Sequence, residues 1–178
     1  MGLLGAIKSA FGTKRVNLEK RFNFSKKWIQ GASGRFHIVQ DKSDGKKYGL
    51  KILDPNKTKQ FRDKFPGKGF ESESQIAFSL KHPSIVRTIE IGQTTNGNEF
   101  LLMEYIDGPH LETVFQERNE TVREKALTII KQLAGAIQSI HEARYIHRDI
   151  CPRNILLSKT GDQAKLFDFS LTVPNAPE

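Results

Sequence analysis

Two polar side chains near the end of the sequence, Asn154 and Asp168, flank a segment with the pattern of a β-hairpin. Its strands are the apolar runs 155–158 and 164–167, joined by the turn residues 159–162. With the turn centred on Gly161, the amide and the carboxylate face each other at the open end. Such oxygens suit Mg²⁺, which completes its shell with water and phosphate. Taken alone, the pair leaves two readings open: turn capping at the ends of the strands, or a magnesium site.

A second pair joins a strand to a helix. Glu73 lies in the helical segment 71–81, and apolar residues follow it at three, four and seven positions: Ile76, Ala77 and Leu80. This spacing places the Glu73 carboxylate on the apolar face of the helix, where it needs a cation. Lys51, on the strand 48–53, is the natural partner. The alternatives are a glutamate favoured by the helix dipole and a lysine on a solvated edge.

A longer motif spans residues 145–157 and runs into the first strand of the predicted hairpin. His147, Arg148 and Asp149 are followed five residues after the aspartate by Asn154. Alone, Asp149 reads as the cap of a loop between a helix and a strand. The whole run resembles the catalytic loop of protein kinases, in particular the eukaryotic-type serine/threonine kinases, of the kind also found in bacteria.

The resemblance assigns a role to each of these residues. It implies that Asp149 accepts or orients the proton of the attacking hydroxyl, and that Asn154 and Asp168 hold the magnesium ions that bridge the phosphates of ATP. It also implies that Lys51 contacts those phosphates and pairs with Glu73, as in the strand-to-helix ion pair of kinases.

The segment 30–38 stands where kinases carry their glycine-rich phosphate loop. Only Gly31 is in register with the three glycines of that motif, and Gly34 is one residue off. Ser33 and Phe36 occupy the other two places. The resemblance implies nucleotide contacts for Gly31, Gly34 and Ile38.

The segment 99–111 resembles the strand and hinge that link the two lobes of a kinase. There the backbone of Glu104 and Ile106 is implied to bind the adenine edge, with Met103 in the gatekeeper position. The other reading, a buried strand that runs into a turn, is compatible with this one.

The sequence departs from the family after the catalytic aspartate. Cys151 replaces a lysine that steadies the transferred phosphoryl group, and Ser170 replaces a glycine. Flanking arginines favour a reactive thiol at Cys151, and partial burial favours a quiet one. The tripeptide 176–178 matches the motif that closes an activation segment, but it follows Asp168 too soon, so we expect the chain to end inside that segment.

The elements that position these residues predict an α+β, kinase-like fold. Two hairpins are expected around the turns 43–45 and 96–97, and a long helix over 121–141, opened by a capping box of Thr121 and Glu124. The expected plan is a basic appendage at 1–24, a β-rich N-lobe with one helix at 25–106, and a hinge with a truncated, mainly helical C-lobe at 107–178.

Composition limits the other possibilities. The 178 residues include 14 glycines and 7 prolines, which excludes collagen-like and low-complexity chains. Residues 1–70 hold 17 lysines and arginines against 5 acidic residues, but they are scattered and often lie beside aspartates, so we expect solvated surface and no nucleic-acid partner. No segment has the length for a membrane span, and the single cysteine favours a reducing, cytoplasmic setting.

These observations predict an ATP- and Mg²⁺-dependent kinase that phosphorylates serine or threonine of a protein substrate. The alternative is a non-catalytic, nucleotide-binding pseudokinase or scaffold. A small-molecule kinase of the aminoglycoside type shares the Asp and Asn spacing, but Arg148 between His147 and Asp149 favours the protein kinases. The sequence does not indicate an oligomeric state.

Overall fold

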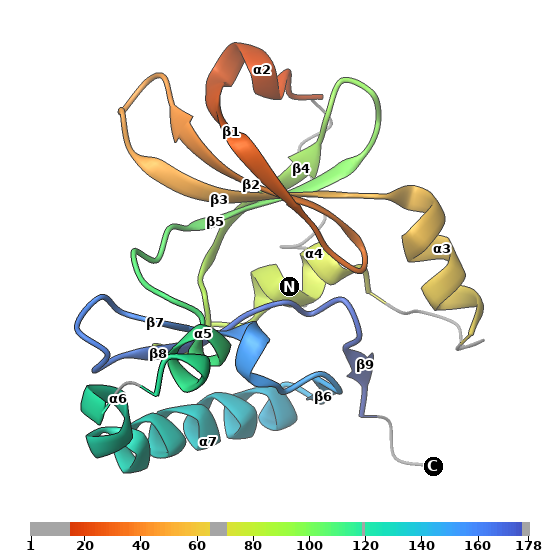
Figure 1. The fold of residues 1–178 in the computed structure, drawn as a ribbon. Helices are drawn as coiled ribbons and strands as arrows, with labels where there is room; N and C mark the ends of the chain where they lie inside the picture. The colour runs from red at the N-terminus through yellow and green to blue at the C-terminus, as the bar shows by residue number, and fades with distance from the viewer. Residues whose placement is uncertain (1–14, 65–70, 119, 176–178) are drawn as a thin grey trace. The chain divides into compact units, whose positions relative to one another are not determined.

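The computed structural model describes residues 15–64, 71–118 and 120–175 and divides the chain into two compact units (Figure 1). The sequence predicts a boundary after residue 106, and the chain passes from the first unit to the second after Tyr105. The segment Ser79–Arg87 also belongs to the second unit, which the sequence did not indicate.

The first unit is built on a five-stranded antiparallel sheet with the order β1-β2-β3-β5-β4. Its strands are β1 Phe22–Gln30, β2 Gly34–Asp41, β3 Lys47–Leu53, β4 Thr88–Gln93 and β5 Glu99–Glu104. The hairpins β2–β3 and β4–β5 confirm the two that the turn signals predict.

The main apolar cluster of this unit covers one face of the sheet. It consists of Leu18, Phe22, Val39, Leu50, Phe100 and Leu102. Leu18, in the short helix α2 Leu18–Arg21, is 6% exposed. The predicted appendage at 1–24 is therefore wrong for residues 15–24, because their apolar side chains complete this cluster. Residues 1–14 lie outside the described residues.

Two further helices belong to the first unit. α4 Glu73–Ser79 lies within the predicted segment 71–81 and starts at a capping box, in which the Ser72 N–H donates to Gln75 Oε1 at 2.8 Å. α3 Pro55–Asp63 is a correction to the prediction of one helix in this half. Its signal was in the sequence: a proline opens the helix, and the Asp54 carboxylate accepts the Asn56 N–H at 2.9 Å.

The second unit is mainly helical and carries two small sheets. The helices are α5 Leu111–Gln116, α6 Glu120–Glu124 and α7 Ala126–Glu142, with a 3₁₀ turn, η1, at Pro152–Asn154. The paired strands are β6 Tyr145–Ile146 with β9 Val173–Pro174, and β7 Ile155–Leu157 with β8 Ala164–Leu166.

The predicted continuous helix over 121–141 is wrong at its beginning. α6 starts at Glu120, so Thr121 lies inside the helix and not at the N-cap position that the sequence predicts. Lys125 separates α6 from α7: its N–H donates to the Val122 carbonyl at 3.1 Å, three residues back, and its ammonium donates to the Thr160 carbonyl at 2.7 Å. The tighter turn and the tie to the neighbouring loop break the α-helical bonding there.

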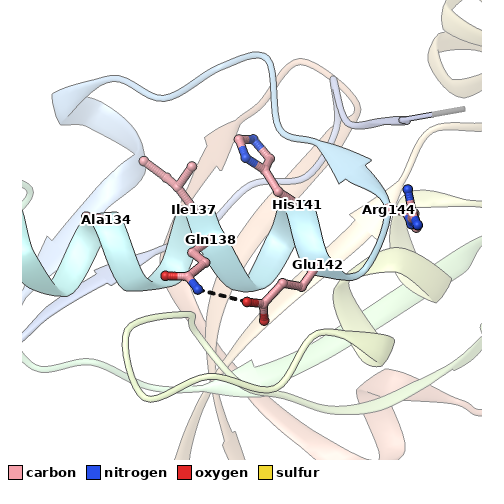
Figure 2. Close-up of a pocket in the computed structure, with 6 residues that line it drawn as sticks. All are labelled: Ala134, Ile137, Gln138, His141, Glu142 and Arg144. Atoms are coloured by element: carbon pink, nitrogen blue, oxygen red, sulfur yellow. Dashed lines mark hydrogen bonds between the residues drawn. The ribbon is translucent and has the colours of Figure 1, made fainter. Parts of the chain in front are cut away.

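α7 has apolar residues on two faces. Ile129, Ala136 and Ile140 are buried within the unit, whereas Leu127 and Ile130 are 64% and 61% exposed. Near its C-terminal end the helix borders a hollow of about 740 Å³ (Figure 2), lined by Ala134, Ile137, Gln138, His141, Glu142 and Arg144. None of the predicted catalytic, nucleotide-binding or metal-binding residues lines it.

Within the described residues, no helix combines the length and the apolar character that a bilayer crossing requires.

Candidate active site

The ion pair predicted between Lys51 and Glu73 is present in the first unit. The Lys51 ammonium lies 2.5 Å from Glu73 Oε1, and the two side chains are 8% and 7% exposed. Lys51 comes from the centre of β3, and Glu73 is the first residue of α4. The pair is confirmed, and its burial excludes the solvated-edge reading of Lys51.

The alternation of β3 explains why Lys51 points to this carboxylate. Leu50 packs into the apolar cluster on one face of the sheet, so Lys51 projects from the other face. On the same face as Lys51, Phe36 lies opposite it in β2, and Ile38 lies opposite Gly49. Ile38 is thus placed on the face of Lys51, as a nucleotide contact requires.

The loop 31–34 between β1 and β2 is held by several side chains. Gly31 donates its N–H to the Gly34 carbonyl at 2.8 Å, and Gln30 Nε2 donates to both Gly31 and Gly34 carbonyls. The Lys57 ammonium, from α3, donates to the Gly31 carbonyl at 3.2 Å. Gly34 must lack a side chain, because a Cβ there would collide with the Ile52 carbonyl.

Ser33 makes the contact that the sequence did not reveal. Its hydroxyl donates to Glu73 Oε2 at 2.5 Å, while Lys51 binds the other oxygen of that carboxylate. The residue that replaces the second glycine of the family motif is thus bonded to the strand-to-helix ion pair. No local sequence pattern signals a bond across 40 residues.

The two residues implied to bind an adenine edge fall at the end of one unit and the start of the other. Glu104 ends β5 and lies opposite Tyr48 of β3. Met103, the expected gatekeeper, is 8% exposed and lies opposite Gly49, on the sheet face of Lys51. Ile106 is the first residue of the second unit after the strand and is partly exposed.

In the second unit, the Asp149 carboxylate is held by two residues of the turn that follows it. Arg153 donates to both carboxylate oxygens, at 3.0 and 3.2 Å, and Asn154 Nδ2 donates to Oδ2 at 2.9 Å. Asn154 Nδ2 also donates to the Asp149 backbone carbonyl at 2.9 Å. From the sequence, the arginines near Cys151 were related only to its thiol, and the ion pair between Arg153 and Asp149 was not predicted. The signal for this pair was the spacing of four residues across the turn η1.

The hairpin that carries Asn154 and Asp168 differs by one residue from the expected register. Ile155 lies opposite Leu166, and Phe167 donates its N–H to the Asn154 carbonyl at 3.0 Å. Asn154 therefore faces Phe167, and Asp168 follows one residue later. The turn is centred between residues 160 and 161 rather than on Gly161, and this displaces the pairing. Both residues still lie at the same end of the hairpin.

Neighbouring elements of the second unit fix this hairpin in place. Gln132 of α7 accepts the Ala164 N–H at 2.7 Å. On the other side, Leu166 donates its N–H to the Ser84 carbonyl and accepts the Val86 N–H, both at 2.9 Å. The short strands are thus bonded on both sides, which gives a fixed base for the residues at their ends.

His147 anchors the loop that carries Asp149. It is 2% exposed, its Nδ1 accepts the Asp149 N–H at 3.2 Å, and its ring lies 5.1 Å from the Phe169 ring in an edge arrangement. Burial lowers the pKa of His147, and the Phe167 carbonyl and the carboxylates of Asp168 and Asp149 oppose that shift. The imidazole is neutral near pH 7.

Two of the four non-glycine residues with a positive φ in the described part of the chain lie beside these residues. Arg148 and Asp168 each have a φ of 66°, in the left-handed region that residues with a Cβ seldom adopt. Such conformations cost about 1–3 kcal/mol each and persist where the surroundings enforce them. Asp168 also accepts the Ser170 N–H at 3.2 Å, so the residue in the glycine position continues the turn.

The surroundings of Cys151 favour the quiet thiol, which is one of the two sequence readings. Burial raises the pKa of its thiol, and the Asp149 carboxylate raises it further. The Asn154 N–H and the Arg153 guanidinium act in the opposite direction without reversing the shift. The flanking arginines therefore do not activate it.

Comparisons with known proteins agree with this geometry. A family model described as the protein kinase domain matches residues 22–174. Serine/threonine-protein kinase pkn2 of Myxococcus xanthus is 29% identical over 156 residues, 86% of this chain and 18% of that protein. A hormonally up-regulated neu tumor-associated kinase homolog of Xenopus tropicalis is 30% identical over 160 residues, 90% of this chain and 22% of that protein.

Solved structures show the same likeness at the level of the fold. The twitchin kinase fragment of C. elegans superposes with a TM-score of 0.70 at 23% identity, covering 92% of this chain and 36% of that one. A longer twitchin kinase region gives a TM-score of 0.71 and covers 28% of that chain. The chain spans about a fifth of the length of the curated relatives it matches.

Proposed function

The chain belongs to the protein kinase family, and on this basis we propose that it transfers the γ-phosphoryl group of ATP to a serine or threonine hydroxyl of a protein substrate. The names of its relatives support a kinase, and one of them is a serine/threonine kinase. The single cysteine, a thiol, supports a cytoplasmic location.

The observation that carries the proposal is the setting of Asp149. Its carboxylate is oriented by Arg153 and Asn154, yet its side chain is 23% exposed and open to an incoming group. A catalytic base needs this combination of a fixed position and an accessible oxygen. The oxygens of a loop-capping aspartate would instead accept hydrogen bonds from nearby backbone N–H groups.

In the proposed reaction, Asp149 accepts the proton of the attacking hydroxyl. The hydroxyl oxygen forms a bond to the γ-phosphorus while the bond from that phosphorus to the β,γ-bridging oxygen breaks, and ADP leaves. Lys51, held by Glu73, contacts the phosphates and offsets their charge.

The donor set of the second unit fits Mg²⁺. Asn154 commits its Nδ2 to Asp149, so its Oδ1 is the amide atom that would bind a cation, and Asp168 lies at the same end of the hairpin. Among the described residues, no group of three or more His, Cys, Asp or Glu could hold a metal. One amide and one carboxylate are what Mg²⁺ uses with phosphates and water. When bound, the ion would neutralise the charge on the phosphates.

A second candidate function is nucleotide binding without catalysis. One replacement favours it: Cys151 stands where kinases carry a lysine, which removes a cation next to Asp149. This weakens the transfer step while it leaves Lys51, Glu73 and Asp168 in place.

Thermal unfolding tests nucleotide binding, which both candidate functions require. ATP with Mg²⁺ should raise the unfolding midpoint, and ATP with EDTA should raise it less. Asp168→Asn should abolish the Mg²⁺-dependent part, since Asn tolerates the left-handed φ but lacks the charge. Asp63→Asn, on the exposed end of α3, is the matched control and should behave as wild type. No shift with MgATP in the wild-type chain would contradict both functions.

A further inference from the structure

Ser33 has a hydroxyl where the family motif has a glycine, and that hydroxyl is bonded to Glu73. The same carboxylate binds the Lys51 ammonium through its other oxygen. Residue 33 of the loop and the ammonium are therefore separated by a single carboxylate group. All three residues lie in the first unit, so this arrangement is internal to one compact body.

The backbone of the loop strengthens this placement. Ser33 accepts the Asp54 N–H at 2.8 Å, and Gly31 accepts the Lys57 ammonium at 3.2 Å. The backbone carbonyls of Gly31 and Ser33 thus both accept hydrogen bonds from the segment that follows β3. The loop is held toward the ion pair by one side-chain bond and by bonds to its backbone.

We propose that the bond from Ser33 to Glu73 holds the phosphate loop closed over the Lys51–Glu73 pair and competes with nucleotide binding. The inference rests on the proposed function, in which phosphates contact Lys51. A phosphate that touches both the ammonium and the loop backbone must enter where the hydroxyl lies. Nucleotide binding therefore requires Ser33 to leave Glu73, and the bond lowers the affinity of the chain for nucleotide.

Removal of the hydroxyl tests the competition. Ser33→Ala should bind MgADP about tenfold more tightly than wild type by calorimetry, because a hydroxyl–carboxylate bond no longer has to break. Ser33→Thr keeps the hydroxyl and should bind as wild type. Ser25→Ala is the matched control: it removes a serine hydroxyl from β1, where Ser25 donates to the Lys27 carbonyl, and should change nothing.

A measurement without nucleotide separates this inference from the proposed function. Amide hydrogen exchange over residues 30–36 of the ligand-free chain should be faster in Ser33→Ala than in wild type, and restored in Ser33→Thr. Equal exchange in all variants would overturn the closed loop. Faster exchange with unchanged or weaker MgADP binding would overturn the competition. If no form binds MgADP, the proposed function and the competition both fail, while a difference in exchange would still support the bond.

Discussion

The ammonium of Lys51 lies 2.5 Å from the carboxylate of Glu73, and both side chains are less than a tenth exposed. Charges this deeply buried are stabilised by each other, since each has given up most of its hydration. The pair fixes α4 to the centre of β3 and sets the direction of the lysine. It is the part of the site that the sequence could locate from helical spacing alone.

Removing one partner of the Lys51–Glu73 pair should lower the free energy of unfolding more than removing both partners. Lys51→Met should lower the free energy of unfolding by about 3–5 kcal/mol, because it leaves a buried carboxylate without its cation. The double variant with Glu73→Leu should recover most of that loss. Urea unfolding followed by the fluorescence of Trp28, the single tryptophan, which lies in the same unit, measures both. Additive losses would contradict the coupling.

Cys151 should react slowly with iodoacetamide at pH 7.5, since burial and then Asp149 raise the pKa of its thiol. Asp149→Asn removes a neighbouring negative charge and should lower that pKa, so the alkylation rate rises. Arg153→Met removes a positive charge and should slow the reaction. The chain has one cysteine, so the total rate reports this site. Equal rates in the three proteins would show that neighbouring charge does not control the thiol.

The stability of the chain should fall as the pH is lowered from 7.5 to 5.5. Burial lowers the pKa of His147 below its ordinary value near 6.5, so below that pH the unfolded chain binds the proton more readily. His147→Gln should reduce the slope of unfolding free energy against pH. His37 has a pKa lowered by burial and by Arg35, so His37→Gln should reduce the slope separately. A slope unchanged in the double variant would contradict this assignment.

Shortening an apolar side chain should lower the stability much more on the buried face of α7 than on its exposed face. Ile140 is fully buried, and Ile140→Ala should cost about 2–4 kcal/mol of unfolding free energy. Leu127 is 64% exposed, and Leu127→Ala should change the stability by about 0.5 kcal/mol or less. Chemical denaturation of the two single variants makes the comparison. A large loss at Leu127 would mean that this face is covered in solution.

Periodicity and turn chemistry were enough to predict much of the structure. The spacing around Glu73 predicted an inward carboxylate, and the glycine turns predicted the hairpins β2–β3 and β4–β5. α3 has a helix-start signal at Asp54 and Pro55, but Phe61 is its only large apolar residue, so the segment has no apolar periodicity that predicts a helix.

Other features depend on contacts between distant segments, which local patterns do not encode. The break at Lys125 depends on a bond to Thr160, and the bond of Ser33 to Glu73 spans 40 residues. The one-residue error at Asn154 arose from the turn, where Ser158 and Thr160 hydroxyls both bond to Asp162 and shift its centre. Side-chain bonds of this kind decide a register that turn composition alone leaves open.

Transfer of label from γ-labelled ATP to casein, compared between wild type and Asp149→Asn, tests the proposed kinase activity most directly. We predict measurable transfer by wild type and a loss of at least about a hundredfold in Asp149→Asn, with MgATP affinity retained, since only the proton acceptor is removed. Asp63→Asn, at the exposed end of α3, is the control and should retain activity. Equal transfer by wild type and Asp149→Asn, or none by wild type, would contradict the account.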